Sequence, residues 1–279
     1  QMLAAYKMYK IFLNVNSVID SPTMCARRVF ELSACSTTVL SGWSRAIEET
    51  FGDLIPVAHT QEEAYNLALY FLNSPELRAR QGHLAMREVL SKHTFSHRVD
   101  QILRDLGWPV RPRSRSVSVV LPTNRPGQIE HAISQVARQR HRNLELVLVL
   151  HNMSEDPSVV RDKALAAGIP EVKVLTADPD WTLGEVLNHG IAHAEGELIA
   201  KMDDDNIYGE HYLSDLIRAF DYTDAEMVGK GAHYTYFPDQ DITVLRLPGL
   251  EHRYAHLIQG ATILAKADLL RAMPFEPVN

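Results

Sequence analysis

The stretch ELIAKMDDDNIY, residues 197–208, joins a short apolar run to three consecutive carboxylates, Asp203, Asp204 and Asp205. The apolar run predicts a buried strand, and a helical pattern follows at residues 210–220. Three adjacent like charges at the end of a strand repel one another, so they require an offsetting charge. Carboxylate oxygens suit Mg²⁺ or Mn²⁺, particularly when substrate phosphates complete the coordination. The stretch therefore indicates a divalent-cation site; the alternative is a solvated acidic turn that caps the next helix.

The sequence before this stretch alternates between strand and helix patterns, which predicts a parallel sheet. In such sheets, ligands bind at the edge where the strands reach their carboxyl ends, and this is where the carboxylates fall. Strands are predicted at residues 117–121, 144–150 and 172–175, and helices at 129–138, 158–167 and 182–194, the last capped by Thr182.

Three motifs in this part occur in the same order and spacing as in a known family. They are VVLPTNR at residues 119–125, LNHGI with AEGE at 187–197, and MDDD at 202–205. Together they closely resemble the GT-A domain of family 2 glycosyltransferases over residues 117–276. The resemblance implies that MDDD is the Asp-x-Asp element of that family.

The resemblance also implies roles for individual residues. Asp205 is expected to be the main ligand of Mn²⁺ or Mg²⁺, with Asp203 near both the metal and the ribose. The remaining residues of the expected nucleotide-sugar pocket are Pro122, Thr123, Arg125 and Asp204. Asn152 lies where relatives often carry an Asp that contacts the base, so the base stays open.

The catalytic base that the resemblance implies is an acidic pair, which is expected beyond Asn279. Glu251 and Glu276 are the nearest acidic candidates, and neither is assigned the role. We therefore expect this chain to bind donor and metal but to turn over poorly. Later strands are predicted near residues 226–229, 242–247 and 259–265, followed by a helix at 266–272, and Tyr234, Tyr236 and Phe237 are expected to fill a sheet face.

The first hundred residues also alternate between strands and helices. Strands are predicted at residues 9–14, 37–40 and 54–58, and helices at 22–34 (opened by Ser21 and Pro22), 61–72 (capped by Thr60), 75–91 and 95–106.

The motifs NVNS at residues 14–17, SPTM at 21–24 and RRVFEL at 27–32 are similar to the second half of GT-B glycosyltransferases of the spore-maturation type. That resemblance implies that Glu31 hydrogen-bonds a donor ribose. We expect an α/β chain of two Rossmann-like domains: an incomplete parallel-sheet GT-B-type domain at 1–108 and a mixed-sheet GT-A-type domain at 117–279. Residues 109–116, rich in proline and arginine, are expected to be the linker.

Composition narrows the function classes. The formal net charge of the 279 residues is −7 without a long basic run, which argues against a nucleic-acid surface. No apolar run reaches the roughly 18 residues of a membrane span, and residues 1–7 lack a signal-peptide pattern. Cys25 and Cys35 have neither metal nor disulfide spacing, so we expect buried thiols and a cytoplasmic location. Gln1 and Asn279 look like cuts through a longer protein.

The predicted function is sugar transfer from a nucleotide-diphosphate donor to a glycan or cell-surface acceptor, in polysaccharide biosynthesis. Inversion at the anomeric carbon is implied by the family. Two alternatives stay open. One is a nucleotide-sugar-binding or scaffold protein without turnover, and the other is a nucleotidyltransferase, for which residues 122–127 are a poor phosphate loop.

Overall fold

The computed structural model describes residues 2–110 and 114–278, apart from the side chain of Leu3. The chain divides into two compact units, residues 1–112 and 113–279, each built on its own sheet. The expectations about Gln1, about Asn279 and beyond, and about linker residues 111–113 lie outside the described residues. The α/β prediction, with a parallel sheet followed by a mixed sheet, is confirmed.

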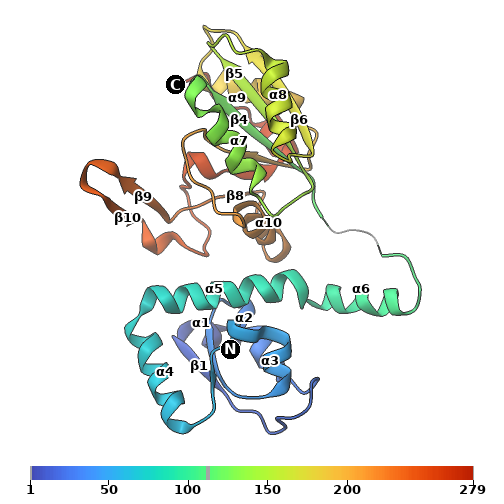
Figure 1. Ribbon diagram of the computed structural model, residues 1–279, viewed down its shortest axis with the longest axis vertical. Coiled ribbons are helices and arrows are strands. Elements are labelled where there is room, and N and C mark those ends of the chain that lie inside the picture. Colours follow the sequence, from blue (N-terminus) through green and yellow to red (C-terminus); the bar gives the residue numbers. More distant parts are fainter. Residues whose placement is uncertain (1, 111–113, 279) are drawn as a thin grey trace. The chain divides into compact units, whose positions relative to one another are not determined.

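The first unit is built on a parallel sheet of order β1-β2-β3 (blue in Figure 1). Its strands are β1 (Ile11–Asn14), β2 (Thr38–Gly42) and β3 (Val57–Ala58). Its helices are α1 (Met2–Met8), α2 (Arg27–Ala34), α3 (Arg45–Phe51), α4 (Gln61–Asn73), α5 (Pro75–Lys92) and α6 (Phe95–Asp105). The Thr60 cap is confirmed, since its side chain accepts the backbone N–H of Glu63.

The predicted helix start at Ser21 and Pro22 is wrong. Helix α2 begins only at Arg27, and the Ser21 hydroxyl instead accepts the backbone N–H of Thr23 at 3.4 Å. A serine side chain can close a local turn as readily as it caps a helix, and here the turn prevails. Cys25 therefore lies outside the helix; it and Cys35 are free, half-buried thiols, and burial raises the pKa of Cys25 to about 11.

The second unit carries a sheet of order β6-β5-β4-β7-β11-β8. The first four strands run parallel, and β11 runs antiparallel to both β7 and β8. The strands are β4 (Val117–Thr123), β5 (Leu144–His151), β6 (Glu171–Ala177), β7 (Leu198–Lys201), β8 (Met227–Val228) and β11 (Leu264–Lys266). The helices are α7 (Ile129–Ala137), α8 (Pro157–Ala166), α9 (Leu183–His193), α10 (Tyr212–Tyr222) and α11 (Ala267–Ala272).

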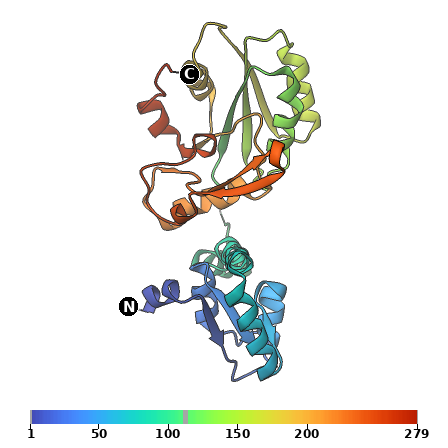
Figure 2. The same ribbon diagram turned by 90° about the vertical axis from the view of Figure 1, so that its left-hand side faces the viewer.

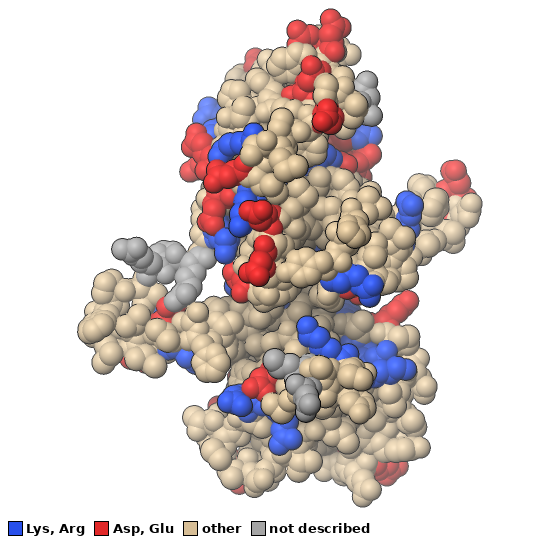
Figure 3. All heavy atoms as spheres, turned by 180° about the vertical axis from the view of Figure 1, so that it is seen from behind, with Lys and Arg blue, Asp and Glu red and all other residues tan. Residues whose placement is uncertain are grey.

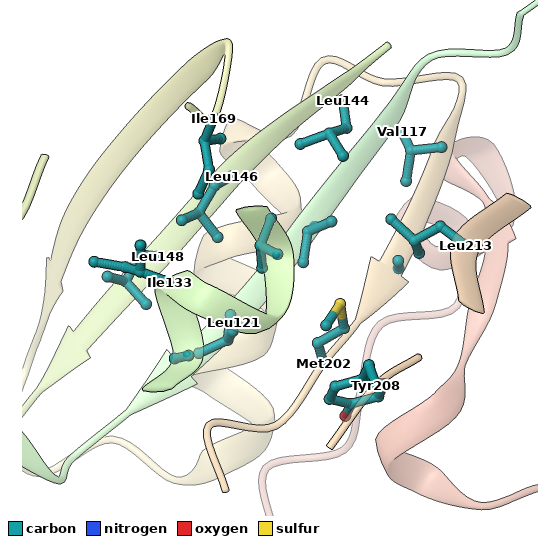
Figure 4. Packing of buried hydrophobic residues seen from close by; sticks show 14 of the residues in the cluster. Val117, Leu121, Ile133, Leu144, Leu146, Leu148, Ile169, Met202, Tyr208 and Leu213 are labelled. Atoms are coloured by element: carbon teal, nitrogen blue, oxygen red, sulfur yellow. The ribbon is translucent and has the colours of Figure 1, made fainter. Parts of the chain in front are cut away.

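Helices cover both faces of this sheet (Figure 2). One core contains side chains of α7, α8 and α10, and Figure 4 shows Leu121, Leu146, Met202 and Leu213 within it. The other core lies under α9 and α11. Because successive residues of a strand point to opposite faces, Ala200 belongs to the first core and Ile199 to the second. The apolar runs of the sequence are therefore strands buried on both faces.

The later strand predicted at residues 242–247 does not join the main sheet, and the aromatic residues Tyr234, Tyr236 and Phe237 lie in the strand that pairs with it. The two strands are β9 (His233–Phe237) and β10 (Ile242–Arg246), which pair with each other in a separate antiparallel hairpin. The hairpin projects from the rest of the unit in Figure 1, and Tyr234 is 68% exposed. Periodicity identifies a strand without its partner, and the position beside β11 is taken by β8.

The charged side chains of the second unit are intermixed in sign on the face drawn in Figure 3, where this unit is at the top. In the described part of the chain, no helix is both long and apolar enough to cross a membrane.

Candidate functional site

The carboxylates lie at the carboxyl edge of the sheet in the second unit. Strand β7 ends at Lys201, and the backbone N–H of Met202 still bonds to the carbonyl of Val120 in β4, at 3.2 Å. Because β4 and β7 are parallel neighbours, the end of β4 at Thr123 stands beside the three aspartates. The topology therefore brings the Pro122–Arg125 segment and the Asp203–Asp205 segment together.

Asp204 is the buried member of the three. Its Oδ2 accepts from the hydroxyl of Thr123 at 2.6 Å and from Nε of Arg125 at 3.1 Å, and its Oδ1 accepts from Nη2 of Arg125. Burial by itself raises the pKa of Asp204, but the hydrogen bonds from Arg125 and Thr123 outweigh it and lower the pKa. Asp204 is thus an ionised carboxylate whose two oxygens already accept hydrogen bonds from Thr123 and Arg125.

Asp203 and Asp205 are more accessible, with side chains 33% and 48% exposed. Oδ2 of Asp205 lies 3.0 Å from Nη2 of Arg125, and the ammonium of Lys201 pairs with Oδ1 of Asp203. Hydrogen bonds to Asp204 and Asp205 raise the pKa of Arg125, so its guanidinium stays charged. These two carboxylates are the members of the cluster that a ligand can reach.

The loop after the carboxylates is held by buried hydrogen bonds. The hydroxyl of Tyr208 accepts the backbone N–H of Asp203 at 2.9 Å and donates to the carbonyl of Ala261 at 2.8 Å. Oε1 of Gln135, from α7, accepts the backbone N–H of Tyr208 at 2.9 Å. Burial raises the pKa of the Tyr208 phenol, which keeps its proton for donation. The position of Asp203 is therefore fixed by segments far apart in sequence.

Sequence reasoning missed these supporting residues. Gln135 and Tyr208 sit in ordinary helix and loop patterns, and no local signal marks them. Lys201 did carry a signal, because a lysine is out of place as the last residue of an apolar strand.

The other predicted residues divide between the two units. Asn152 follows β5 at the same edge, with a left-handed backbone (φ 49°), and Pro122 is in β4. Glu31 lies in the first unit, where the hydroxyl of Tyr6 donates to its carboxylate at 3.3 Å and Arg27 pairs with it at 2.9 Å. The structure therefore gathers the GT-A residues and leaves Glu31 in a different unit.

Helix α9 accounts for the second sequence motif. Its start is the predicted Thr182 cap, which forms a full capping box with Glu185. Asn188 donates to the carbonyl of Phe275 at 2.8 Å and accepts the N–H of Phe275 at 2.9 Å. A Cβ on Gly190 would stand 2.6 Å from a side-chain methyl of Val120, so the helix packs directly on β4. The motif residues therefore position the helix and the C-terminal segment.

The carboxylate oxygens at this edge of the sheet supply only some of the ligands that a hard cation needs. Within the described ranges, no three His, Cys, Asp or Glu side chains are grouped to hold a metal ion by themselves. Asp203 and Asp205 offer oxygen ligands, and Mg²⁺ in proteins is commonly held by one or two carboxylates plus waters and substrate phosphates. The residues fit a cation that arrives with a phosphate ligand.

Comparison with known proteins bears on both units. Residues 118–264 match the family described as glycosyl transferase family 2, and residues 1–104 match the family described as glycosyl transferase-like. Both resemblances inferred from the sequence are thereby confirmed. The chain is 26% identical over 144 residues to glycosyltransferase GlyG of Streptococcus pneumoniae serotype 4 (strain ATCC BAA-334 / TIGR4), covering 48% of each chain. The chain thus spans about half the length of this curated relative.

Solved structures with a similar arrangement include two complexes with a sugar nucleotide. The mannosyltransferase PcManGT of Pyrobaculum calidifontis, in complex with GDP-Man and Mn²⁺, is 20% identical with a TM-score of 0.48, covering 68% of this chain and 58% of its own. TarS of S. aureus (residues 1–349), in complex with UDP-GlcNAc, is 17% identical with a TM-score of 0.42, covering 56% and 47%. The family match at residues 118–264 extends over more than half of the 279 residues, and the chain therefore belongs to glycosyl transferase family 2.

Proposed function

We propose that the second unit binds a nucleoside diphosphate sugar together with Mn²⁺ or Mg²⁺ and transfers the sugar to a glycan acceptor with inversion. The observation that carries this proposal is the pair of accessible carboxylates, Asp203 and Asp205, held on a fixed loop beside Arg125. Family membership supports a transferase, and the edge of the sheet is where α/β proteins bind ligands.

The carboxylates have a defined part in this proposal. Asp205, the most exposed of the three, is the main cation ligand, and Asp203 is the second. A bound cation would stabilise the negative charge that develops on the departing nucleoside diphosphate. Asp203 and Asp205 together form the Asp-x-Asp element, and Asp204 holds Arg125 beside Asp205.

Arg125 is the second positive charge of the proposed site, after the divalent cation. Its side chain is 47% exposed although it binds the buried Asp204, so part of the side chain faces solvent. A guanidinium can donate to two oxygens at once, which matches the geometry of a diphosphate. We assign Arg125 to the donor phosphates, and Pro122, Thr123 and Asn152 to the nucleoside.

Glu31 is not included in this site. Its carboxylate is held by Tyr6 and Arg27, and it belongs to the first unit. None of the described residues is assigned the role of accepting the acceptor proton. Glu251 and Glu276 are exposed, and within the described ranges no hydrogen bond or ion pair links either of them to the aspartates.

Calorimetric titration of UDP and of GDP, each with and without Mn²⁺, tests the proposal. We expect Mn²⁺ to tighten binding of one nucleotide by at least about tenfold, or about 1.4 kcal/mol. Asp205→Asn should abolish this gain, whereas Asp162→Asn, on exposed α8, should keep it. A metal-dependent gain that survives Asp205→Asn contradicts the assignment, and failure of both nucleotides to bind contradicts donor binding as a whole.

Transfer is tested separately from binding. With the matching UDP-sugar or GDP-sugar and Mn²⁺, slow release of free sugar to water is expected, since water can replace the acceptor. Binding without any release would favour the alternative of a nucleotide-sugar-binding protein.

A further inference from the structure

Lys201 is an unusual residue for its position. It ends β7, whose other residues, Leu198, Ile199 and Ala200, are aliphatic and fully buried. Lys201 itself is only 9% exposed. Lysine is among the residues least often buried without a partner, because removing its charge from water is costly. Its place in the strand therefore calls for a specific partner.

That partner is Asp203. Strand β7 ends at Lys201, two residues before Asp203, and the ammonium of Lys201 pairs directly with Oδ1 of Asp203. The backbone of Lys201 is fixed by a 2.8 Å hydrogen bond from its N–H to the carbonyl of Ile263. The backbone N–H of Asp203 is held by the hydroxyl of Tyr208. Lysine and carboxylate are thus anchored independently and face each other.

The charges of the cluster formed by Asp203–Asp205, Arg125 and Lys201 nearly cancel one another. Arg125 pairs with Asp204 and Asp205, and Lys201 pairs with Asp203, so three carboxylates and two cations leave a formal charge of −1. A divalent cation that arrives alone must compete with Lys201 for Asp203 and with Arg125 for Asp205. A cation that arrives with a diphosphate brings its own oxygen ligands and offers Arg125 a new anionic partner.

We propose that Lys201 is a built-in counter-ion of Asp203 that makes tight cation binding conditional on the nucleoside diphosphate. Lys201 acts through Asp203, so it is a positioning residue. The inference rests on the proposed function, because it takes Asp203 as a cation ligand. Its consequence is that the protein binds little free Mn²⁺ and loads the cation together with the donor.

Titration of Mn²⁺ alone, followed by electron paramagnetic resonance, tests this role. In Lys201→Met the formal charge of the cluster becomes −2, and Mn²⁺ should bind at least about fivefold more tightly without nucleotide. The enhancement of Mn²⁺ binding by the nucleotide should fall correspondingly, because the free cation no longer competes with Lys201 for Asp203, and Mn²⁺ should enhance nucleotide binding less by the same factor. A merely structural role predicts the opposite, namely weaker binding of Mn²⁺.

Two control variants separate this effect from general charge and from folding. Lys201→Arg keeps the positive charge and should behave as the unaltered chain does. Lys173→Met also removes a lysine. Lys173 lies in β6 and pairs with Glu145 and Glu195, so its loss should leave Mn²⁺ binding unchanged. If Lys201→Met does not fold, the double variant with Asp203→Asn removes both charges; its Mn²⁺ affinity should equal that of Asp203→Asn alone.

The outcomes distinguish this inference from the function on which it rests. If Mn²⁺ binds folded Lys201→Met no more tightly than the unaltered chain, while UDP or GDP still enhances Mn²⁺ binding, the counter-ion role is overturned and the proposed function stands. An Mn²⁺ affinity of the double variant that differs from that of Asp203→Asn also overturns it. If neither nucleotide enhances Mn²⁺ binding to the unaltered chain, the proposed function fails.

Discussion

Two neighbouring tyrosines offer a matched test of how the carboxylate loop is held. The rings of Tyr208 and Tyr212 are both buried, with their centroids 4.8 Å apart. The hydroxyl of Tyr208 joins the N–H of Asp203 to the carbonyl of Ala261. Within the described residues, the buried hydroxyl of Tyr212 has no hydrogen-bond partner. The same chemical change, Tyr to Phe, should therefore have different effects at the two positions.

The magnitude follows from the groups left behind. Tyr208→Phe keeps the buried ring but leaves a carbonyl and an N–H without their partner, which costs about 1–3 kcal/mol of unfolding free energy. For a unit of this size, 1 kcal/mol shifts Tm by about 2–4 °C. Tyr212→Phe removes a polar group that is buried without compensation, so it should be neutral or stabilising by up to about 1 kcal/mol.

Urea unfolding and scanning calorimetry of both variants provide the measurement. Tyr208→Phe should also weaken metal-dependent nucleotide binding, because Asp203 loses its backbone anchor, whereas Tyr212→Phe should not. Equal loss of stability in the two variants, or a larger loss in Tyr212→Phe, would show that the hydroxyl bridge does not hold the loop.

Three further predictions concern the packing and charge around the site. Gly190→Ala should cost about 1–3 kcal/mol in urea unfolding, because its Cβ would stand 2.6 Å from a valine methyl of β4, whereas Gly127→Ala, with open space around it, should change little. The folded pKa of Asp204 is lowered below an unfolded value of about 3.9, so its stabilising contribution is complete above about pH 5 and is lost as pH falls through the folded pKa. Asp204→Asn should accordingly lower stability at pH 7 and flatten the acid limb of a stability–pH curve; an unchanged acid limb would refute the role of its pairing with Arg125. Asn188→Ala removes two hydrogen bonds to the C-terminal segment, so amide hydrogen exchange at residues 273–278 should accelerate at least about fivefold while exchange in β4 stays slow.

Much of the fold could be predicted because its signals are local. The apolar runs at β4, β5 and β7 gave the central strands of the sheet, and Thr60 and Thr182 marked helix starts through side-chain bonds to residues three positions on. The carboxyl-edge position of Asp203–Asp205 followed from the alternation of strands and helices. The prediction of a helix start at Ser21 was wrong because a serine hydroxyl can also stabilise a turn, as it does here.

The sequence by itself determined the order of elements, the two family resemblances and the identity of the carboxylate cluster, since each depends on residues close together in the chain. Only the tertiary structure decided which carboxylates are accessible to a ligand. Asp204 is taken by Arg125 from 79 positions away, and the loop is held through Tyr208 by Ala261 from 53 positions away. It also decided that β10 pairs with β9 and not with the main sheet. The physical reason is that a hydrogen bond or ion pair needs its partners within a few ångströms, and the folded backbone alone sets which distant residues come that close.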